Sequence, residues 1–284
     1  MGHVNVPEGL KEIIQQNNEK AYPQIIMEQA SYPYLFHLSD IRENLIAFLP
    51  VTKQMHVLER NAGCGALTGK LLSMALHVTA VVESEEEADI LRVRYENAGN
   101  LTVLVVPASD TKPETNVLYQ DQVYDMILIA GEFSKFQNEL SCMREHLSDN
   151  GKLYVADANR LGLKYWAGCT EDHVGKYFEG IEGYANTEGI KTFSRKELEN
   201  IIRKTGNWKI DFYYPYPDYK LPMTVYSDKH LPNKGELNNT RYNFDRERLQ
   251  LFDETRVYDG IINNGLLQEF FNSFLVILEE KADE

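Results

Sequence analysis

The sequence predicts an α/β fold: a Rossmann-like, doubly wound sheet of about seven strands, the last of them antiparallel. Three observations lead to this expectation. Short apolar runs alternate with amphipathic, helix-length segments between residues 55 and 156. A glycine-bearing turn follows the first apolar run, and the second run ends in an acidic residue. Strands that alternate with helices imply right-handed crossovers and a parallel sheet covered on both faces.

Helices are expected ahead of the sheet, over residues 8–50. Leu10, Ile13 and Ile14 recur at helical spacing. Ser39 and Asp40 are typical of a helix start, and Pro50 is typical of a helix end. Residues 1–50 are therefore expected to form an N-terminal helical cap.

The alternating segments locate the elements of the sheet. Strands are expected at 55–58, 78–82, 101–106, 124–130 and 152–156, and helices at 66–76, 85–97 and 136–147, with a turn at 149–151. The run 124–130 is almost continuously apolar, as buried parallel strands are.

The pattern loosens after residue 157. A helix over 194–205 is predicted by Ser194 and Glu197, which are spaced as a capping box. Strands are expected at 208–214 and 272–279, separated by a proline-bearing segment. We therefore expect one domain built from 51–214 and 266–284, with residues 215–265 inserted over its active-site end.

Composition narrows the classes of function. The chain has 284 residues, 43% of them hydrophobic, and a formal net charge of −14. Such a surface repels phosphate backbones and anionic lipid, which disfavours nucleic-acid and membrane-surface roles. No apolar run approaches the ~18–20 residues of a membrane helix, so no membrane insertion is expected. The first residues lack the pattern of a signal peptide, and the three cysteines form no CxxC pair, which indicates a reducing cytoplasm.

The turn after the first strand is the most informative segment. Gly63 and Gly65 would let the backbone approach a ligand, and the helix that follows presents free N–H groups. Glu59 adds a fixed negative charge at the strand end. Glu83 ends the second strand, where doubly wound folds place a carboxylate on ribose hydroxyls. Together these residues predict a nucleotide site.

The identity of the nucleotide follows from the charges and the glycine spacing. Gly69 is misplaced as the third glycine of the dinucleotide fingerprint, which argues against a dehydrogenase. An acid just before the turn suits a ligand with an ammonium group and a single carboxylate. S-adenosyl-L-methionine is such a ligand.

The segment resembles motif I, (D/E)-x-G-x-G-x-G, of the class I S-adenosylmethionine-dependent methyltransferases. Glu59, Gly63 and Gly65 match the pattern, Asn61 replaces its first glycine, and Arg60 occupies a usually apolar position. Asn tolerates left-handed backbone, so Asn61 is expected to adopt that conformation. The resemblance implies that the cofactor-binding residues are Glu59, Asn61, Ala62, Gly63, Gly65, Glu83, Ser84, Ser109, Asp110 and Ala130. His37 and Arg42, from the expected N-terminal helix, could reach the carboxylate of the cofactor, or they could serve helix capping and surface pairing.

A narrower resemblance covers nearly the whole chain. Segments 34–44, 159–168, 171–173, 180–184 and 212–222 are similar to a subgroup of bacterial methyltransferases fused to, or encoded beside, glycosyltransferases of surface-polysaccharide pathways. This resemblance implies a glycan or small polar acceptor and a glycosyltransferase as a partner.

The loop after the fifth strand supplies candidates for the acceptor site, because ligands bind beyond the carboxyl ends of such strands. His173 is the candidate general base, with a surface or structural histidine as the alternative. Arg160 and Lys164 could hold an anionic acceptor, or they could form ion pairs within an acidic protein. Asn159, Arg160 and His173 are expected to lie near the transferred methyl group. No metal site is expected, because adjacent residues such as Glu171 and Asp172 rarely face one ion.

The expected function is methyl transfer to an O or N atom of a glycan or small polar acceptor. The alternative is a non-catalytic S-adenosylmethionine-binding module that serves as a scaffold in glycan assembly; Arg60 and Asn61 motivate it.

Overall fold

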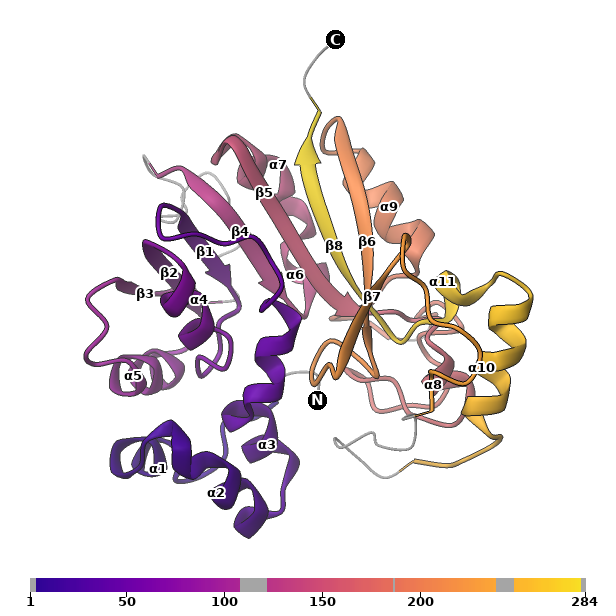
Figure 1. The fold of residues 1–284 in the computed structure, drawn as a ribbon, viewed down its shortest axis with the longest axis horizontal. Helices are drawn as coiled ribbons and strands as arrows, with labels where there is room; N and C mark the ends of the chain where they lie inside the picture. Colours follow the sequence, from indigo (N-terminus) through magenta and orange to yellow (C-terminus); the bar gives the residue numbers. More distant parts are fainter. Residues whose placement is uncertain (1–3, 108–121, 186, 239–247, 282–284) are drawn as a thin grey trace.

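The computed structural model describes residues 4–107, 122–185, 187–238 and 248–281 (Figure 1). Its N-terminal part is helical, as expected, but consists of short pieces. These are α1 (Leu10–Gln16), η1 (Glu19–Ala21), α2 (Tyr22–Gln29), α3 (Tyr32–Leu38) and η2 (Asp40–Leu45). The helix start predicted at Ser39 is confirmed, since the Ser39 hydroxyl accepts a hydrogen bond from Ile41 N, yet the segment that follows is a 3-10 helix.

One sheet organises the rest of the described chain. Its strand order is β3-β2-β1-β4-β5-β8-β6-β7. The first five strands in this order are parallel, and helices lie between β1 and β2, between β2 and β3, and between β4 and β5 along the chain. They are β1 (His56–Arg60), β2 (His77–Val82), β3 (Leu101–Val105), β4 (Tyr124–Ala130) and β5 (Leu147–Ala158), with α4 (Thr68–Met74) and α5 (Glu85–Arg94) between the first three.

The other edge of the sheet is antiparallel. Strand β8 (Ser273–Glu280) runs antiparallel between β5 and β6 (Trp208–Tyr216), which confirms the expected antiparallel last strand. The sheet has eight strands rather than seven, because β7 (Thr224–Ser227) pairs with the end of β6. This extra strand lies in the segment expected to be an insertion, which also contains α10 (Glu254–Asn263).

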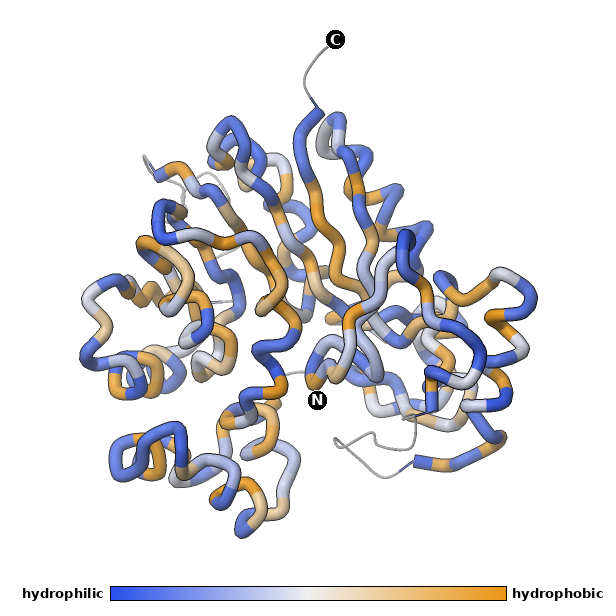
Figure 2. Tube along the Cα trace, viewed as in Figure 1, coloured by the Kyte–Doolittle hydropathy of each residue, from blue (hydrophilic) through white to orange (hydrophobic). Residues whose placement is uncertain are grey.

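Both faces of the sheet are buried. Along β4, Ile127 and Ile129 belong to one apolar cluster, whereas Met126 and Leu128 belong to a second cluster on the opposite face. Figure 2 shows the resulting apolar centre, with hydrophilic residues concentrated at the periphery. This two-sided burial explains why the run 124–130 carries almost no polar residues.

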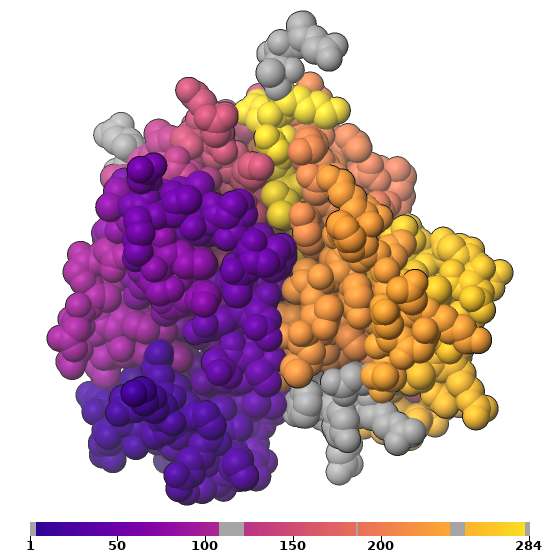
Figure 3. All heavy atoms as spheres, in the orientation of Figure 1, coloured from indigo at the N-terminus to yellow at the C-terminus, as the bar shows by residue number. Residues whose placement is uncertain are grey.

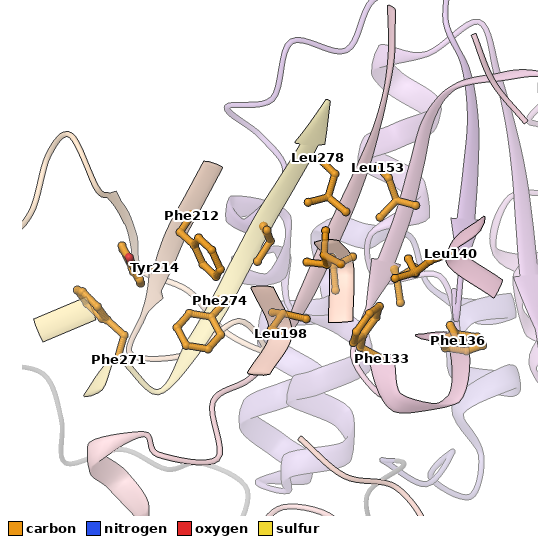
Figure 4. Packing of buried hydrophobic residues seen from close by; sticks show 14 of the residues in the cluster. Phe133, Phe136, Leu140, Leu153, Leu198, Phe212, Tyr214, Phe271, Phe274 and Leu278 are labelled. Atoms are coloured by element: carbon orange, nitrogen blue, oxygen red, sulfur yellow. The ribbon is translucent and has the colours of Figure 1, made fainter. Parts of the chain in front are cut away.

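One of the two clusters is richer in aromatic residues than the other. Phe133, Phe212 and Phe274 come from a helix and two strands, and Figure 4 shows them gathered on one face of the sheet. The helices of this face are α6 (Phe133–Phe136), η5 (Gln137–Glu139), α7 (Leu140–Glu145) and α9 (Arg195–Arg203). The capping box predicted for α9 is present, with Ser194 and Glu197 bonded reciprocally.

The boundaries of β5 differ from the expectation. The strand begins at Leu147, so the turn expected at 149–151 lies within it. Its pairing with β4 is irregular there: Tyr124 lies opposite Leu147, whereas Met126 lies opposite Lys152. The turn residues therefore form an irregularity in the β4–β5 ladder rather than a break between elements.

Segments distant in sequence converge at the carboxyl ends of the parallel strands. In Figure 1 these ends point toward the N-terminal helices on one side and toward α8 (Leu163–Trp166), α10 and α11 (Leu267–Phe270) on the other. Figure 3 shows the end of the N-terminal segment beside the segment after β6, where Asn44 Nδ2 donates to Pro222 O at 2.9 Å. Every helix in the described ranges is too short or too polar to span a bilayer.

Candidate active site

The turn after β1 has the conformation that its sequence predicts. Asn61 is left-handed, with φ 65°, and Gly63 and Gly65 also have positive φ. The backbone is held by hydrogen bonds from Ala62 N to Val81 O and from Gly65 N to Ala62 O. Asn61 therefore performs the conformational role that glycine has in the motif.

The glycines of this region serve different purposes. A Cβ on Gly65 would lie 2.7 Å from Leu91 Cδ2 and 2.9 Å from a Tyr95 ring carbon, so Gly65 is required by the packing of α5. A Cβ on Gly69 would lie 2.7 Å from Tyr95 Oη, so this glycine also serves helix packing. At Gly63 the nearest atom would be 3.9 Å away, which leaves that backbone open to a neighbouring molecule.

Glu59 supports the turn from the buried end of β1. Its side chain is buried, and its carboxylate accepts a hydrogen bond from Thr68 Oγ1 at 2.6 Å, which ties the end of β1 to the start of α4. Burial raises the pKa of Glu59 to about 7, although Thr68 and the nearby Arg42 oppose the shift. Its burial makes Glu59 a support of the turn rather than a group exposed to a ligand.

A small cavity of about 50 Å³ lies over this turn, and we call it the turn cavity. Its wall is formed by the turn itself, the end of β4, the N-terminal segment and the segment after β6, including Asn61, Ala62, Gly63, Ala130, Glu132, His37, Arg42, Tyr219 and Lys220. The polar lining comes from four regions of the chain, so only the fold assembles it.

Arg42 is the unusual member of this lining. It is buried, and its guanidinium carbon lies 3.7 Å from the centre of the Phe36 ring. Among the residues that the structure describes, no acceptor bonds to its Nε or Nη1. A buried donor without an acceptor is unfavourable, so these atoms favour an anion in the turn cavity.

His37 lies beside Arg42. Its Nε2 is 3.3 Å from Asn5 O, and burial, reinforced by Arg42, lowers its pKa to about 4. The imidazole is therefore neutral near pH 7, and Arg42 rather than His37 supplies the positive charge of this wall.

A larger cavity of about 290 Å³, the lateral cavity, lies beside the end of β2. Glu83, Val106, Pro107 and Lys135 are among its lining residues. Both carboxylate oxygens of Glu83 accept hydrogen bonds from Lys135 Nζ, at 2.9 and 3.0 Å, and the same ammonium lies 2.7 Å from Glu132 Oε2. Glu83 thus occupies the predicted position, with a partner that the sequence analysis missed.

The remaining predicted cofactor residues differ in their positions. Ser84 caps α5 by accepting from Glu87 N, and its hydroxyl donates to Glu87 Oε2, which gives it a structural role. Ala130 contributes to the turn cavity. Ser109 and Asp110 lie outside the described residues.

Two candidate acceptor-site residues of the segment after β5 are bonded within the protein. Asn159 is fully buried: its amide donates to Glu269 O and Phe271 O, and its carbonyl accepts from Leu161 N. Arg160 forms a bidentate pair with Glu197 and donates to the carbonyls of Gly180 and Ile181. Both side chains hold loops together, so neither is available to an acceptor in this structure.

His173 lies in a buried polar network. Its backbone N–H donates to Glu171 Oε2, and Glu171 also accepts from Val174 N and Tyr184 Oη, which occupies that carboxylate. Burial lowers the pKa of His173 to about 4, although Asp172 and Glu132 oppose the shift. The imidazole is neutral near pH 7.

Two buried lysines surround Asp172. Lys164 Nζ lies 3.2 Å and Lys220 Nζ 2.9 Å from Asp172 Oδ2. Asp172 and Glu171 therefore face different partners, and within the described ranges no group of three His, Cys, Asp or Glu side chains could hold a metal ion.

Lys135 and Lys220 were not among the predicted site residues. Tyr219 Oη would lie 2.9 Å from a Cβ on Gly131, at the edge of the turn cavity. Lys135 follows the end of β4 by five residues, and strand ends are where sheets of this class bind ligands, so that rule was the available signal. Tyr219 and Lys220 reach the site only through the path of the chain after β6.

Comparison with solved structures identifies the fold. A chain from the complex between the Haloferax volcanii Trm112 methyltransferase activator and the putative methyltransferase aligns over 99% of both chains, with a TM-score of 0.54 and 14% identity. Haemonchus contortus phosphoethanolamine N-methyltransferase 1, in complex with phosphoethanolamine and S-adenosylhomocysteine, aligns with a TM-score of 0.52 and 12% identity, over 96% of this chain and 51% of that one.

Sequence comparison adds no closer relationship. No known protein family matches the sequence by its profile, and no curated protein matches it. At these identities the structural likeness shows the fold alone: the chain has the Rossmann-like class I methyltransferase fold, as the sequence predicted.

Proposed function

We propose that this protein is an S-adenosyl-L-methionine-dependent methyltransferase. The observation that carries the proposal is the left-handed turn at Asn61 and Gly63, which opens onto a cavity at the carboxyl edge of a class I sheet. Glu83 lines the adjoining lateral cavity at the position of the ribose-binding acid.

The residues present fit this cofactor. The unsatisfied donors of Arg42 match its carboxylate, the open backbone at Gly63 allows close approach, and the Glu83 carboxylate can accept from two ribose hydroxyls. When bound, the cofactor supplies a methyl group activated by a sulfonium.

The acceptor side is proposed to use His173 as general base. Three properties support this role: burial, a neutral imidazole near pH 7, and electrostatic proximity to Glu132 and Lys220, which line the turn cavity. A hydroxyl acceptor would give up its proton to this imidazole, whereas a neutral amine would need only correct positioning. The buried surroundings would also exclude water from the reaction.

We propose a glycan or small polar molecule as the acceptor, methylated on O or N, in surface-polysaccharide biosynthesis with a glycosyltransferase as partner. The resemblance of segments 159–168 and 212–222 supports this choice. The cysteines Cys64, Cys142 and Cys169 form no disulfide bond, which suits a reducing cytoplasm. We also propose the division into a cap over 1–50, a catalytic domain over 51–214 and 266–284, and an insertion over 215–265.

The second candidate function is a non-catalytic S-adenosylmethionine-binding scaffold. The observation that favours it is the engagement of Asn159 and Arg160 in loop contacts. Arg60, the other motivation, is accommodated structurally, because its guanidinium pairs with buried Glu139 and lies over Phe136. The two candidates predict the same cofactor binding but differ in turnover with a supplied acceptor.

Calorimetric titration with S-adenosylmethionine tests the proposal. Wild-type protein should bind, and Glu83→Ala should weaken binding by about 1.5–3 kcal/mol, the range for hydrogen bonds to a charged group. Glu85→Ala is the matched control, since Glu85 is an exposed acid two residues further on that pairs with Arg92. Absence of binding by the wild type would overturn the proposed function, and equal affinity of both variants would reject the role of Glu83.

A further inference from the structure

Lys135 connects two carboxylates that come from different strand ends. Its ammonium lies 2.9 Å from Glu83 Oε1, after β2, and 2.7 Å from Glu132 Oε2, after β4. The Glu132 side chain is only 4% exposed, and those of Lys135 and Glu83 are 21% exposed. Burial lowers the pKa of Lys135, but Glu132 and Glu83 raise it by more, so Lys135 remains charged.

The ammonium lies between the two cavities. Glu83 and Lys135 line the lateral cavity, whereas Glu132 lines the turn cavity. A ligand that extends from one cavity to the other must therefore pass this ion pair. Since ribose hydroxyls would use the same Glu83 oxygens that Lys135 now occupies, the ligand and Lys135 compete for one carboxylate.

The fold holds this triad in place. Glu132 has a left-handed backbone, φ 56°, which is unfavourable for a residue with a side chain. Gly131 N donates to Ala156 O at 2.7 Å, and Asp157 Oδ2 accepts from Phe133 N at 3.0 Å, so the end of β5 anchors both sides of Glu132. With its backbone fixed, Glu132 keeps its carboxylate at the boundary of the cavities, and the flexible Lys135 is the member that can move.

We propose that Lys135 is an internal counter-ion of Glu83 and Glu132 that competes with the cofactor, so that it limits the preference of the cleft for the cationic S-adenosylmethionine over its neutral product. This inference rests on the proposed function. S-adenosylmethionine carries a net positive charge and can compensate Glu132 when Lys135 leaves Glu83. S-adenosylhomocysteine has no net charge, so the charge of Lys135 opposes the binding of S-adenosylmethionine more than that of S-adenosylhomocysteine.

The experiment compares the dissociation constants of S-adenosylmethionine and S-adenosylhomocysteine, by calorimetry, for wild type, Lys135→Met and Lys135→Arg. Lys135→Met leaves two carboxylates without their cation, so the preference for S-adenosylmethionine should rise by roughly tenfold, as expected for one partly screened charge pair. Lys135→Arg keeps the charge and should retain the wild-type preference. Lys196→Met, a neutralisation at a 70% exposed lysine of α9, should change neither constant.

Several outcomes would overturn the inference. An unchanged ratio of the two constants in Lys135→Met, or equal weakening of both ligands, would mean that Lys135 only supports the fold. Melting curves verify that each variant is folded, and Lys135→Gln replaces Lys135→Met if the latter does not fold. Failure of wild-type protein to bind either ligand would overturn the proposed function itself, and with it this inference; binding with an unaltered ratio overturns the inference alone.

Discussion

The turn after β1 and the segment after β5 both follow buried parallel strands, yet their polar residues behave differently. In the turn, backbone conformation and an open face at Gly63 define the site. In the segment after β5, Asn159 is fully buried, and both Asn159 and Arg160 are bonded to distant parts of the chain. The first region presents groups to a cavity, whereas the second uses its polar groups to hold loops together.

This difference shows which functional features depend on residues that are close in the sequence. The left-handed conformation of Asn61 depends on residues within a few positions, and so does the acid at the end of β2. The partner of Arg160 is Glu197, 37 residues away, and this partner decides that the guanidinium is not free. A polar residue near a strand end is therefore a site candidate only until its long-range partners are known.

Replacing His173 gives the largest expected effect. A loss of turnover would show that the segment after β5 also contributes a catalytic group, unlike its residues Asn159 and Arg160. His173→Ala should lower turnover by ~10²–10⁴ while leaving cofactor affinity nearly unchanged, because a general base acts on the acceptor. Steady-state rates and calorimetry on the same preparation measure the two effects. A parallel loss of affinity and melting temperature would instead assign His173 to the scaffold.

The pH profile gives an independent check on His173. With a pKa of about 4 in the free protein, the imidazole stays neutral as pH falls from 8 toward 5. Protonation of this group should therefore leave kcat/KM unaffected until the pH approaches 4. A fall centred near ~6.5, the ordinary histidine value, would show that the base is a different or more exposed histidine.

Replacing Arg160 tests whether the polar groups of the segment after β5 stabilise the fold. Arg160→Met removes the bidentate pair with Glu197 and two bonds to carbonyls, so unfolding free energy should fall by about 2 kcal/mol. Urea unfolding measures the change. Arg203→Met, which breaks an exposed pair with Glu199 on the same helix, α9, should lose no more than ~0.5 kcal/mol.

A result confined to acceptor binding would contradict this assignment of Arg160. If Arg160→Met retained wild-type stability but weakened binding of anionic acceptors, the guanidinium would be a ligand group, as the sequence alone suggested. The turn after β1 and the segment after β5 would then no longer differ in whether their polar groups are available to a ligand.

The pH dependence of the unfolding free energy tests whether buried Glu59 supports the turn after β1. Its pKa is about 7 in the folded protein, above the ~4.3 of an unfolded glutamate, so its contribution to stability is fully present below pH 4 and is lost as pH rises through 7. Glu59→Gln cannot ionise. The variant should match wild type near pH 4 and become more stable than wild type by about 2 kcal/mol at pH 8.

Thermal or urea unfolding at several pH values measures this divergence. The Glu59→Gln side chain can still accept the bond from Thr68 Oγ1, so a loss of that contact should not obscure the result. A variant that is less stable than wild type at pH 8 would show that the ionised Glu59 is favoured by its surroundings, with Arg42 as the dominant partner.

The sequence predicted the sheet more fully than the site. The apolar run 124–130 and the capping box at Ser194 follow from local pattern, and both elements are found where expected. The eighth strand was missed because β7 is only four residues long and pairs with β6 through a proline-rich connection. Glu83 was predicted by its strand end, but its partner Lys135 depends on how β2 and β4 are placed in the sheet.

The smallest expected effect concerns Asn61, and it tests whether the turn acts through backbone alone. The Asn61 amide makes only long contacts, 3.4 Å, to Ala130 O and Gly131 O, so its side chain contributes little. Asn61→Gly should therefore retain or slightly tighten cofactor binding, because glycine adopts φ 65° without steric strain. Asn61→Ala, which keeps a Cβ and loses the tolerance of asparagine for this conformation, should destabilise the protein by about 1 kcal/mol. Calorimetry with both variants separates the two contributions. A large loss of affinity in Asn61→Gly would mean that the amide contacts the ligand, and the turn would then resemble the segment after β5 in recognising its partner through a side chain.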